Sequence, residues 1–138
     1  MSTAWDLSTQ QEDTSAYLDL QANSSGIGNP NGGCITDDGV HIFAVQYGQN
    51  KVWHWTLSTA FDLSTASFSE VGTNFTQAWA GCKISPNGTQ LLTWYSDNQE
   101  ETFRSYTLST AYDVSTATVS YTHLRAHETK ANLVCRLL

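Results

Sequence analysis

The stretch Ser58-Thr59-Ala60-Phe61-Asp62-Leu63-Ser64-Thr65 decides the fold, because it occurs three times in the chain. Residues 2–9 are S-T-A-W-D-L-S-T, and residues 109–116 are S-T-A-Y-D-V-S-T. The copies begin 56 and 51 residues apart, and only one aromatic and one aliphatic position vary, each within its class. Such a period indicates an architecture of stacked units of about fifty residues.

A second repeated element keeps the same phase as this octet. Residues 33–39 (G-C-I-T-D-D-G) are echoed by residues 81–88 (G-C-K-I-S-P-N-G), and Cys34 and Cys82 align as equivalent positions. The last glycine of each copy precedes the next octet by 19 and 21 residues. The two extra residues fit the polar loop around 97–100, where an insertion is tolerated.

The segments between these markers have the β-branched and aromatic composition of strands that are covered on both faces. Gly39 and Gly88 each end a tight hairpin turn that needs a positive φ. The strands that follow are predicted at residues 41–47, 51–57 and 66–71, and again at 90–95, 102–108 and from 117–118 onward. Four short strands per unit are typical of a propeller blade and leave no room for the helices of a helical solenoid.

The string Ser85-Pro86-Asn87-Gly88-Thr89, followed by an apolar strand, a polar turn and the octet, resembles a family of bacterial and phage repeat propellers, which are WD-repeat-like and YVTN-like. Blades of that family contain S-P-D-G-T and then Y-T-L-S-T-A-W-D-I-S-T-A. The resemblance covers Met1 to Thr118, although the first unit has T-D-D-G at 36–39, which alters its turn chemistry. It implies an all-β fragment of a β-propeller with about two four-stranded antiparallel blades, and it carries over no catalytic residue.

Both ends of the chain depart from the repeat. Met1 stands where Leu57 and Leu108 stand in the other copies, so the chain is expected to open in the middle of a unit, and residues 1–6 have neither the basic nor the apolar region of a signal peptide. Residues 119–138 resemble a translated Nextera-type sequencing adapter in order, frame and spacing. We therefore expect the end of a preceding blade at 1–20, a blade at 21–71, a truncated blade at 72–118, and a foreign tail outside the fold at 119–138. With fewer than three units, such a chain is expected to expose unpaired strand edges and to aggregate or fold loosely.

The charge balance excludes some classes of partner. Residues 1–118 hold twelve acidic side chains against three basic ones. Nucleic-acid binding needs clustered Lys and Arg, so this body does not favour it. No apolar run reaches the length of a membrane span.

The histidines and cysteines yield no site by themselves. His41 and His54 align with Gln90 and Ser105, so they are interpreted as surface or rim residues and not as repeated metal ligands. Equivalent atoms of neighbouring blades are expected to lie beyond disulfide reach, so Cys34 and Cys82 are predicted to be buried free thiols. The remaining members of these classes fall in the tail: His123, His127 and Cys135.

The octet supplies two further candidates. Its aromatic position (Trp5, Phe61, Tyr112) suits either packing between units, which we favour, or a sugar-stacking platform. Its aspartates are predicted to accept hydrogen bonds from turn amides: Asp6, Asp62 and Asp113.

Three other sequence motifs do not indicate a functional site. Asp97, Glu100 and Glu101 miss the calcium-loop pattern. The glycines at 26 and 28 lack the third glycine and the helix of a dinucleotide fingerprint. Glycosylation sequons are expected by chance in a chain so rich in Ser and Thr, and three occur: Asn23, Asn74 and Asn87.

Catalytic, cofactor-binding and metal-binding residues are therefore all predicted to be absent. The function expected is a non-catalytic binding or structural module of a larger secreted, surface or virion protein, with a protein or a glycan as its partner. The alternative is a fragment of a propeller enzyme, such as a lactonase-like or glycan-cleaving hydrolase. An enzyme should have unmatched His, Asp or Glu side chains that converge on the central channel of the propeller, and the two units give no sign of such convergence.

Overall fold

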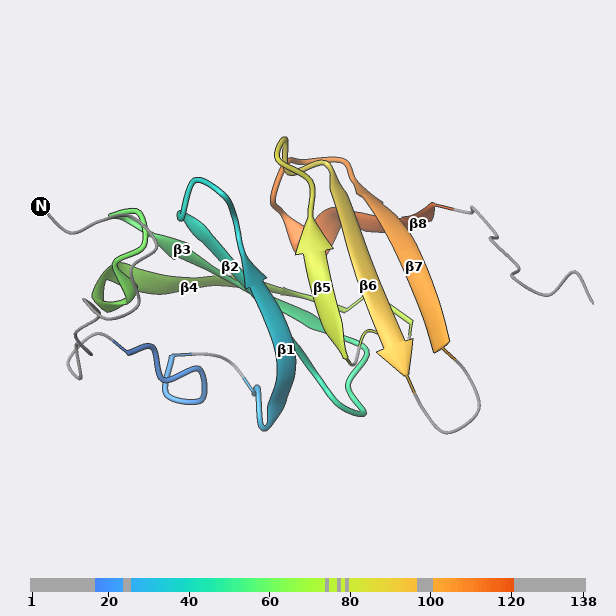
Figure 1. Cartoon of the computed structure of the whole chain (residues 1–138), viewed down its shortest axis with the longest axis horizontal. Coiled ribbons are helices and arrows are strands. Elements are labelled where there is room, and N and C mark those ends of the chain that lie inside the picture. Colours follow the sequence, from blue (N-terminus) through green and yellow to red (C-terminus); the bar gives the residue numbers. More distant parts are fainter. Residues whose placement is uncertain are drawn as a thin grey trace, which may run out of the picture.

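The computed structural model describes residues 17–23, 26–73, 75, 76, 78, 80–96 and 101–120, with the side chains of Ser96 and Glu101 left out. These residues form two four-stranded antiparallel sheets in which strand order follows chain order (Figure 1). Sheet 1 consists of β1 (Pro30–Ile35), β2 (His41–Gln46), β3 (Val52–Leu57) and β4 (Ala66–Gly72). Sheet 2 consists of β5 (Gly81–Ile84), β6 (Gln90–Ser96), β7 (Glu101–Leu108) and β8 (Ala117–Ser120). The all-β prediction is confirmed at this level, and no α-helix occurs in the described part of the chain.

The two hairpin turns have the geometry that their residues demand. Gly39 has φ 72° and Gly88 has φ 70°, as the turn chemistry predicts. The carboxylate of Asp38 accepts a hydrogen bond from the amide two residues ahead at 3.1 Å, and the amide oxygen of Asn87 does the same at 3.2 Å. The T-D-D-G and S-P-N-G turns therefore close in the same way despite their different sequences.

The octets at 58–65 and 109–116 each form the loop between the third and fourth strands of their sheet and end in a single 3₁₀ turn, η2 (Leu63–Thr65) or η3 (Val114–Thr116). Asp62 accepts from the Ser64 amide at 3.0 Å, and Asp113 accepts from the Ser115 amide at 2.9 Å. The predicted role of these two aspartates is confirmed, whereas Asp6 lies outside the described residues.

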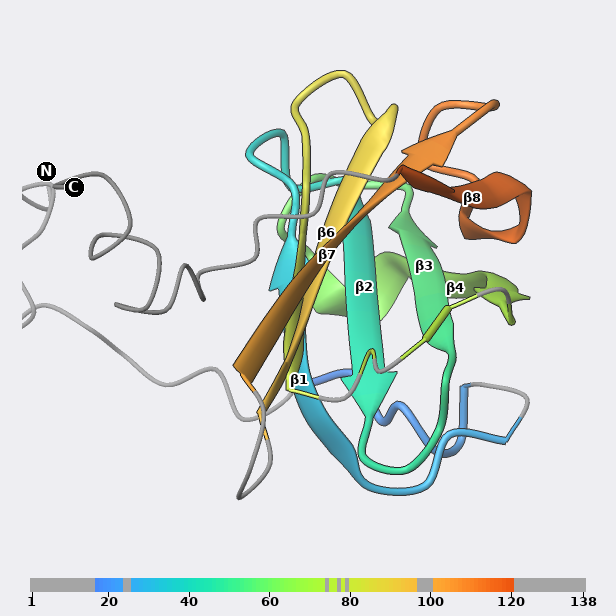
Figure 2. The ribbon, with the colours of Figure 1, turned by 90° about the vertical axis from the view of Figure 1, so that its right-hand side faces the viewer.

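The two sheets pack against each other (Figures 1 and 2). One face of sheet 1 contacts the opposite face of sheet 2, and we call this arrangement head-to-tail stacking. Successive residues of a strand point to opposite faces. We call front the face of sheet 1 that carries Phe43 and Val45, and back the face that carries Ala44 and Trp53. Ile42 and Trp55 form a cross-strand pair on the back face of sheet 1, and Leu91 and Tyr106 form the equivalent pair of sheet 2. Leu91 and Tyr106 therefore mark the back face of sheet 2, and the other residues of each strand alternate accordingly.

The core lies between the front face of sheet 1 and the back face of sheet 2. It joins Phe43, Val45 and Val52 to residues of sheet 2 and of the segment before it: Phe75, Ala78, Cys82, Ile84, Leu91, Tyr106, Leu108, Val114 and Ala117. On the back face of sheet 1, Leu18, Leu20 and Ile27 cover Trp53 and Trp55.

The front face of sheet 2 differs from that of sheet 1, because no described residue covers it. Phe103 is 69% exposed and Leu92 is 37% exposed. The expectation that every strand is covered on both faces is therefore wrong for β6 among the described residues.

Strand β8 extends to Ser120, which pairs with Ser105 of β7, while Val119 pairs with Tyr106. The strand thus includes Val119 and Ser120, the first two residues of the segment that departs from the repeat. A β-ladder is made by backbone groups, so residues of any origin can continue it.

Candidate functional site

A chain of polar side chains lies on the front face of sheet 1, at its joint with sheet 2. The Nδ1 atom of His54 lies 2.6 Å from Oε1 of Glu70, and its Nε2 atom lies 2.9 Å from Nδ1 of His41. The three side chains come from β3, β4 and β2, and the first two face each other because His54 and Glu70 are paired across the ladder. His54 is only 4% exposed, whereas His41 and Glu70 are partly exposed.

The carboxylate at one end determines which atoms of the chain donate and which accept each hydrogen bond. Since Glu70 can only accept, Nδ1 of His54 donates, and Nε2 of a neutral His54 then accepts from Nδ1 of His41. Partial burial and the neighbouring His54 lower the pKa of His41 below its ordinary value of 6.5, and the charges of Asp38 and Glu70 offset part of this effect. Two imidazoles and a carboxylate in this order can pass a proton along the joint.

Sheet 2 completes the chain from the opposite side. The ring of Tyr112 stacks on the imidazole of His41, with centroids 4.1 Å apart and planes 6° apart. The amide of Val114 donates to Oε1 of Glu70 at 3.3 Å. Both residues belong to the octet at 109–116 and its 3₁₀ turn, so this loop holds the polar chain of sheet 1 in place.

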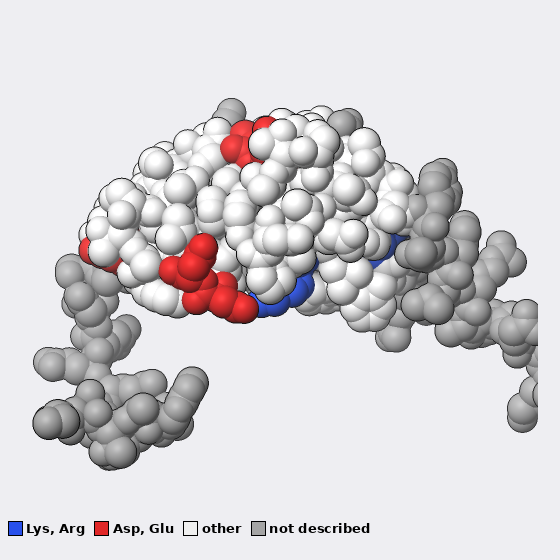
Figure 3. All heavy atoms as spheres, turned by 90° about the horizontal axis from the view of Figure 1, so that it is seen from above, with Lys and Arg blue, Asp and Glu red and all other residues white. Residues whose placement is uncertain are grey.

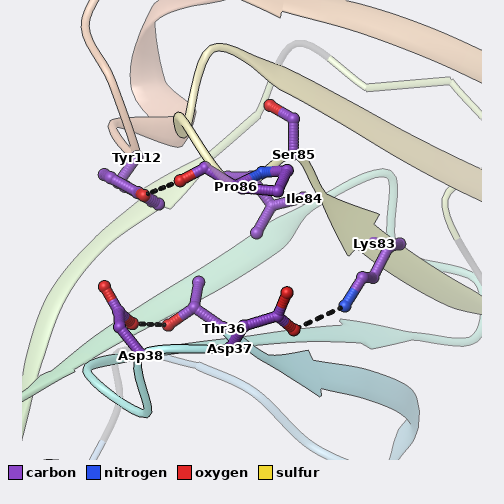
Figure 4. Close-up of a pocket in the computed structure, with 8 residues that line it drawn as sticks. All are labelled: Thr36, Asp37, Asp38, Lys83, Ile84, Ser85, Pro86 and Tyr112. Carbon is purple, nitrogen blue, oxygen red and sulfur yellow. Dashed lines mark hydrogen bonds and ion pairs between the residues drawn. The ribbon is translucent and has the colours of Figure 1, made fainter.

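A small cleft lies between the two hairpin turns beside this stack (Figure 4). One wall is formed by Thr36, Asp37 and Asp38, the other by residues 83–86, and Tyr112 closes one end. The Tyr112 hydroxyl donates to the carbonyl of Pro86 at 2.5 Å, which pins the aromatic ring to its own sheet. The Thr36 hydroxyl and the Val40 amide lower the pKa of Asp38 below 3.8.

The cleft is too small and too loosely closed for a substrate site. Its volume is about 180 Å³, whereas ligand pockets have volumes of about 300 Å³ or more. The only ion pair across it joins Lys83 and Asp37 at 3.5 Å, and both side chains are more than half exposed. An exposed pair of this kind contributes little.

The sequence interpretation is wrong for His54, which is buried and not a rim residue. Aligning the repeat gives the residue types that replace His41 and His54, but it does not show that His54 meets Glu70 across the ladder. The available signal was the coincidence of His41 and His54 with strand positions that face the same side.

The two cysteines lie closer together than the sequence analysis predicts. Their Sγ atoms lie 3.6 Å apart, and both are free thiols. Aligning the repeats on their glycines makes Cys34 and Cys82 equivalent, but Cys34 pairs with Phe43, and Lys83 is the residue that pairs with the corresponding Leu92. Cys34 therefore points to the front of sheet 1 and Cys82 to the back of sheet 2. Head-to-tail stacking brings these two faces, and the two sulfurs, together.

The aromatic position of the octet has two environments. Tyr112 packs against the other sheet, whereas Phe61 is 62% exposed and covers only its own turn at Gly39. Trp5 lies outside the described residues, as do Asp97, Glu100, Asn74 and the tail residues His123, His127 and Cys135.

In the part of the chain that the structure describes, no three His, Cys, Asp or Glu side chains gather so that they could hold a metal ion. No described helix is long and apolar enough to cross a membrane. On the face seen from above, basic side chains form no patch and charged groups of either sign are sparse (Figure 3).

No family model, curated protein or solved structure matches the chain in the three comparisons. The class of protein that the structure defines is thus a pair of stacked four-stranded antiparallel sheets with a polar joint, and its function is argued from that joint.

Proposed function

We propose that the two sheets are successive blades of a β-propeller, and that the chain is a non-catalytic binding or structural module of a larger secreted, surface or virion protein. The resemblance of the octet and of the S-P-N-G-T string to repeat propellers supports this proposal. The same strand order, the same hairpin turns and the same 3₁₀ turn in both sheets support it as well.

The observation that carries the proposal is the head-to-tail joint. The covered front face of sheet 1 and the open front face of sheet 2 are the same face by register. A contact between unlike faces can be repeated from unit to unit, and it forms a ring where the rotation closes. The positions that Val52 and Phe43 occupy in the joint correspond to Phe103 and Leu92, two exposed apolar side chains on the front face of sheet 2. An apolar face of this kind is expected to be buried by a further unit.

A chain extended by one unit tests this proposal. A copy of residues 72–120 inserted after Ser120 supplies a second back face of the kind that already packs on sheet 1. We expect slower amide hydrogen exchange in β6 and β7 of the original unit and a higher urea midpoint, because each added unit contributes an interface. Unchanged exchange in β6 and β7 would refute head-to-tail propagation.

The second candidate is catalysis, and it rests on the Glu70–His54–His41 chain. A carboxylate that orients an imidazole is the arrangement that activates a base in many hydrolases. Two observations weigh against it: His54 is buried, and no described hydroxyl or thiol side chain hydrogen-bonds either imidazole. Hydrolysis of lactone or aryl-glycoside probes that is abolished in His41→Gln, with the fold intact, would favour the enzyme.

A further inference from the structure

We propose that Cys34 and Cys82 are a thiol modification site, at which a low-molecular-weight disulfide such as glutathione disulfide converts the two thiols into a reversible covalent link between the sheets. The inference does not depend on the function proposed above, because it uses only the contact between β1 and β5.

The two strands approach closely enough for such a bond. The sulfurs lie 3.6 Å apart, so they must come closer by about 1.5 Å to reach the length of a disulfide. The backbones touch at the same crossing, since a Cβ atom at Gly32 would overlap the carbonyl oxygen of Ala80. Rotation of two short side chains is therefore the main change required.

The two thiols have different chemical characters. The hydrogen bond between the two sulfurs, together with the Ile84 amide and the charge of Lys83, lowers the pKa of Cys34 against the opposing effect of burial. The pKa of Cys82 is raised well above its usual range by the same hydrogen bond and by burial. Since the thiolate is the nucleophile in thiol–disulfide exchange, Cys34 is the attacking residue and Cys82 the resolving one.

The attacking residue is also the more accessible of the two. Cys82 is 1% exposed, whereas Cys34 is only half-buried, on the edge strand β1 of sheet 1. A small disulfide therefore has access to Cys34 but not to Cys82.

The reaction balances in two exchanges. The Cys34 thiolate attacks one sulfur of glutathione disulfide, the glutathione S–S bond breaks, and one glutathione leaves as a thiolate that takes up a proton. Cys82 then loses its proton to solvent and attacks the Cys34 sulfur of the mixed disulfide, releasing the second glutathione. The protein dithiol is oxidised by two electrons, and glutathione disulfide is reduced to two thiols.

Peptide mapping after equilibration in a glutathione redox buffer tests the proposal on the whole chain. Trypsin cuts after Lys51 and Lys83, so Cys34 and Cys82 fall in peptides 1–51 and 52–83, while Cys135 falls in peptide 131–136. We expect peptides 1–51 and 52–83 to be joined under non-reducing conditions. The linked fraction should be at least about tenfold larger in buffer than in 8 M urea, because the fold supplies the proximity. The oxidised chain should also melt several degrees higher.

Two matched variants separate the roles, and circular dichroism checks that each remains folded. Cys82→Ser should retain glutathione on Cys34, since the resolving thiol is missing, and Cys34→Ser should take up glutathione at neither position 34 nor 82. The proposal is overturned if the unsubstituted chain retains glutathione on Cys34 without linked peptides, or if the linked fraction is equal in buffer and in urea.

Discussion

Tyr112 of the octet at 109–116 lies flat on His41 of sheet 1, with the two ring centroids 4.1 Å apart and the planes nearly parallel. The same imidazole is hydrogen-bonded to His54, which in turn contacts Glu70. One stacked pair thus couples the octet of one sheet to the polar chain of the other. The predictions below use urea unfolding in a common buffer that contains a stabilising osmolyte, because a chain of two units is expected to be marginally stable.

Lowering the pH should weaken the fold through His41. Its pKa lies below the ordinary value of 6.5 in the folded chain, so the unfolded chain binds more protons between the folded and unfolded pKa values. The free energy of unfolding therefore rises with pH in this window and falls as the pH drops below about 6.5. The expected result is a lower urea midpoint at pH 5.5 than at pH 7.5.

His41→Gln should flatten this dependence, since glutamine stands at the corresponding position 90 and does not titrate. Titration of Asp38 does not explain a change in stability between pH 5.5 and pH 7.5, because the pKa of Asp38 is lowered in the folded chain and its effect falls at lower pH. An equal slope in both proteins would assign the pH dependence to other groups.

Glu70→Gln should lower the free energy of unfolding by about 1–2 kcal/mol, because a charge-assisted hydrogen bond to buried His54 becomes a neutral one. Ser69→Ala on the same strand is the matched control. Ser69 bonds only the exposed hydroxyl of Thr56, and its removal should change the free energy by less than about 0.5 kcal/mol. Equal effects would mean that the polar chain does not stabilise the joint.

Thr93→Val should stabilise the chain by about 1 kcal/mol, since a buried hydroxyl without a partner is replaced by a methyl group of similar size. Thr93 is fully buried on the back face of sheet 2, and its Oγ1 atom has no hydrogen-bond partner among the described residues. Thr107→Val, at an exposed position of the neighbouring strand, is the control. A destabilised Thr93→Val would indicate that this hydroxyl is bonded in solution.

Gly32→Ala should destabilise the joint without harming the hairpin that contains it. The added Cβ atom would overlap the Ala80 carbonyl of the other sheet, and a backbone atom cannot move aside as a flexible side chain can. We expect a loss of about 1–3 kcal/mol, as for other overpacked sites, together with less cross-linking of Cys34 to Cys82. Unchanged stability would place the two strands further apart than described.

The fold was more predictable from sequence than the joint. Each turn and strand is set by neighbours in the chain: Gly39 and Gly88 need a positive φ, and the aromatic and β-branched runs begin directly after them. The joint depends on which faces meet, and a shift of one residue reverses a side chain from front to back. Aligning Cys34 with Cys82 introduced that shift, and so hid a contact that the strand register makes plain.

The positive φ of Phe61 and Tyr112, 62° and 64°, could not be foreseen from their residue types either. Bulky side chains avoid this region unless the surroundings stabilise it. Each amide donates to the carbonyl of the glycine in the facing turn, at 2.9 Å and 2.8 Å, and each ring covers that glycine. Tertiary contacts within each sheet therefore impose the conformation.

Paired glycine substitutions at these two positions test the stacking of the sheets most directly. Phe61→Gly and Tyr112→Gly relieve the same backbone strain and uncover the same kind of turn, but only Tyr112 also stacks on the other sheet. We predict that Tyr112→Gly lowers the free energy of unfolding by about 2 kcal/mol more than Phe61→Gly, because it also loses the stacking on His41, apolar burial and the hydroxyl hydrogen bond to Pro86. Equal effects of the two substitutions would contradict the head-to-tail joint on which the account rests.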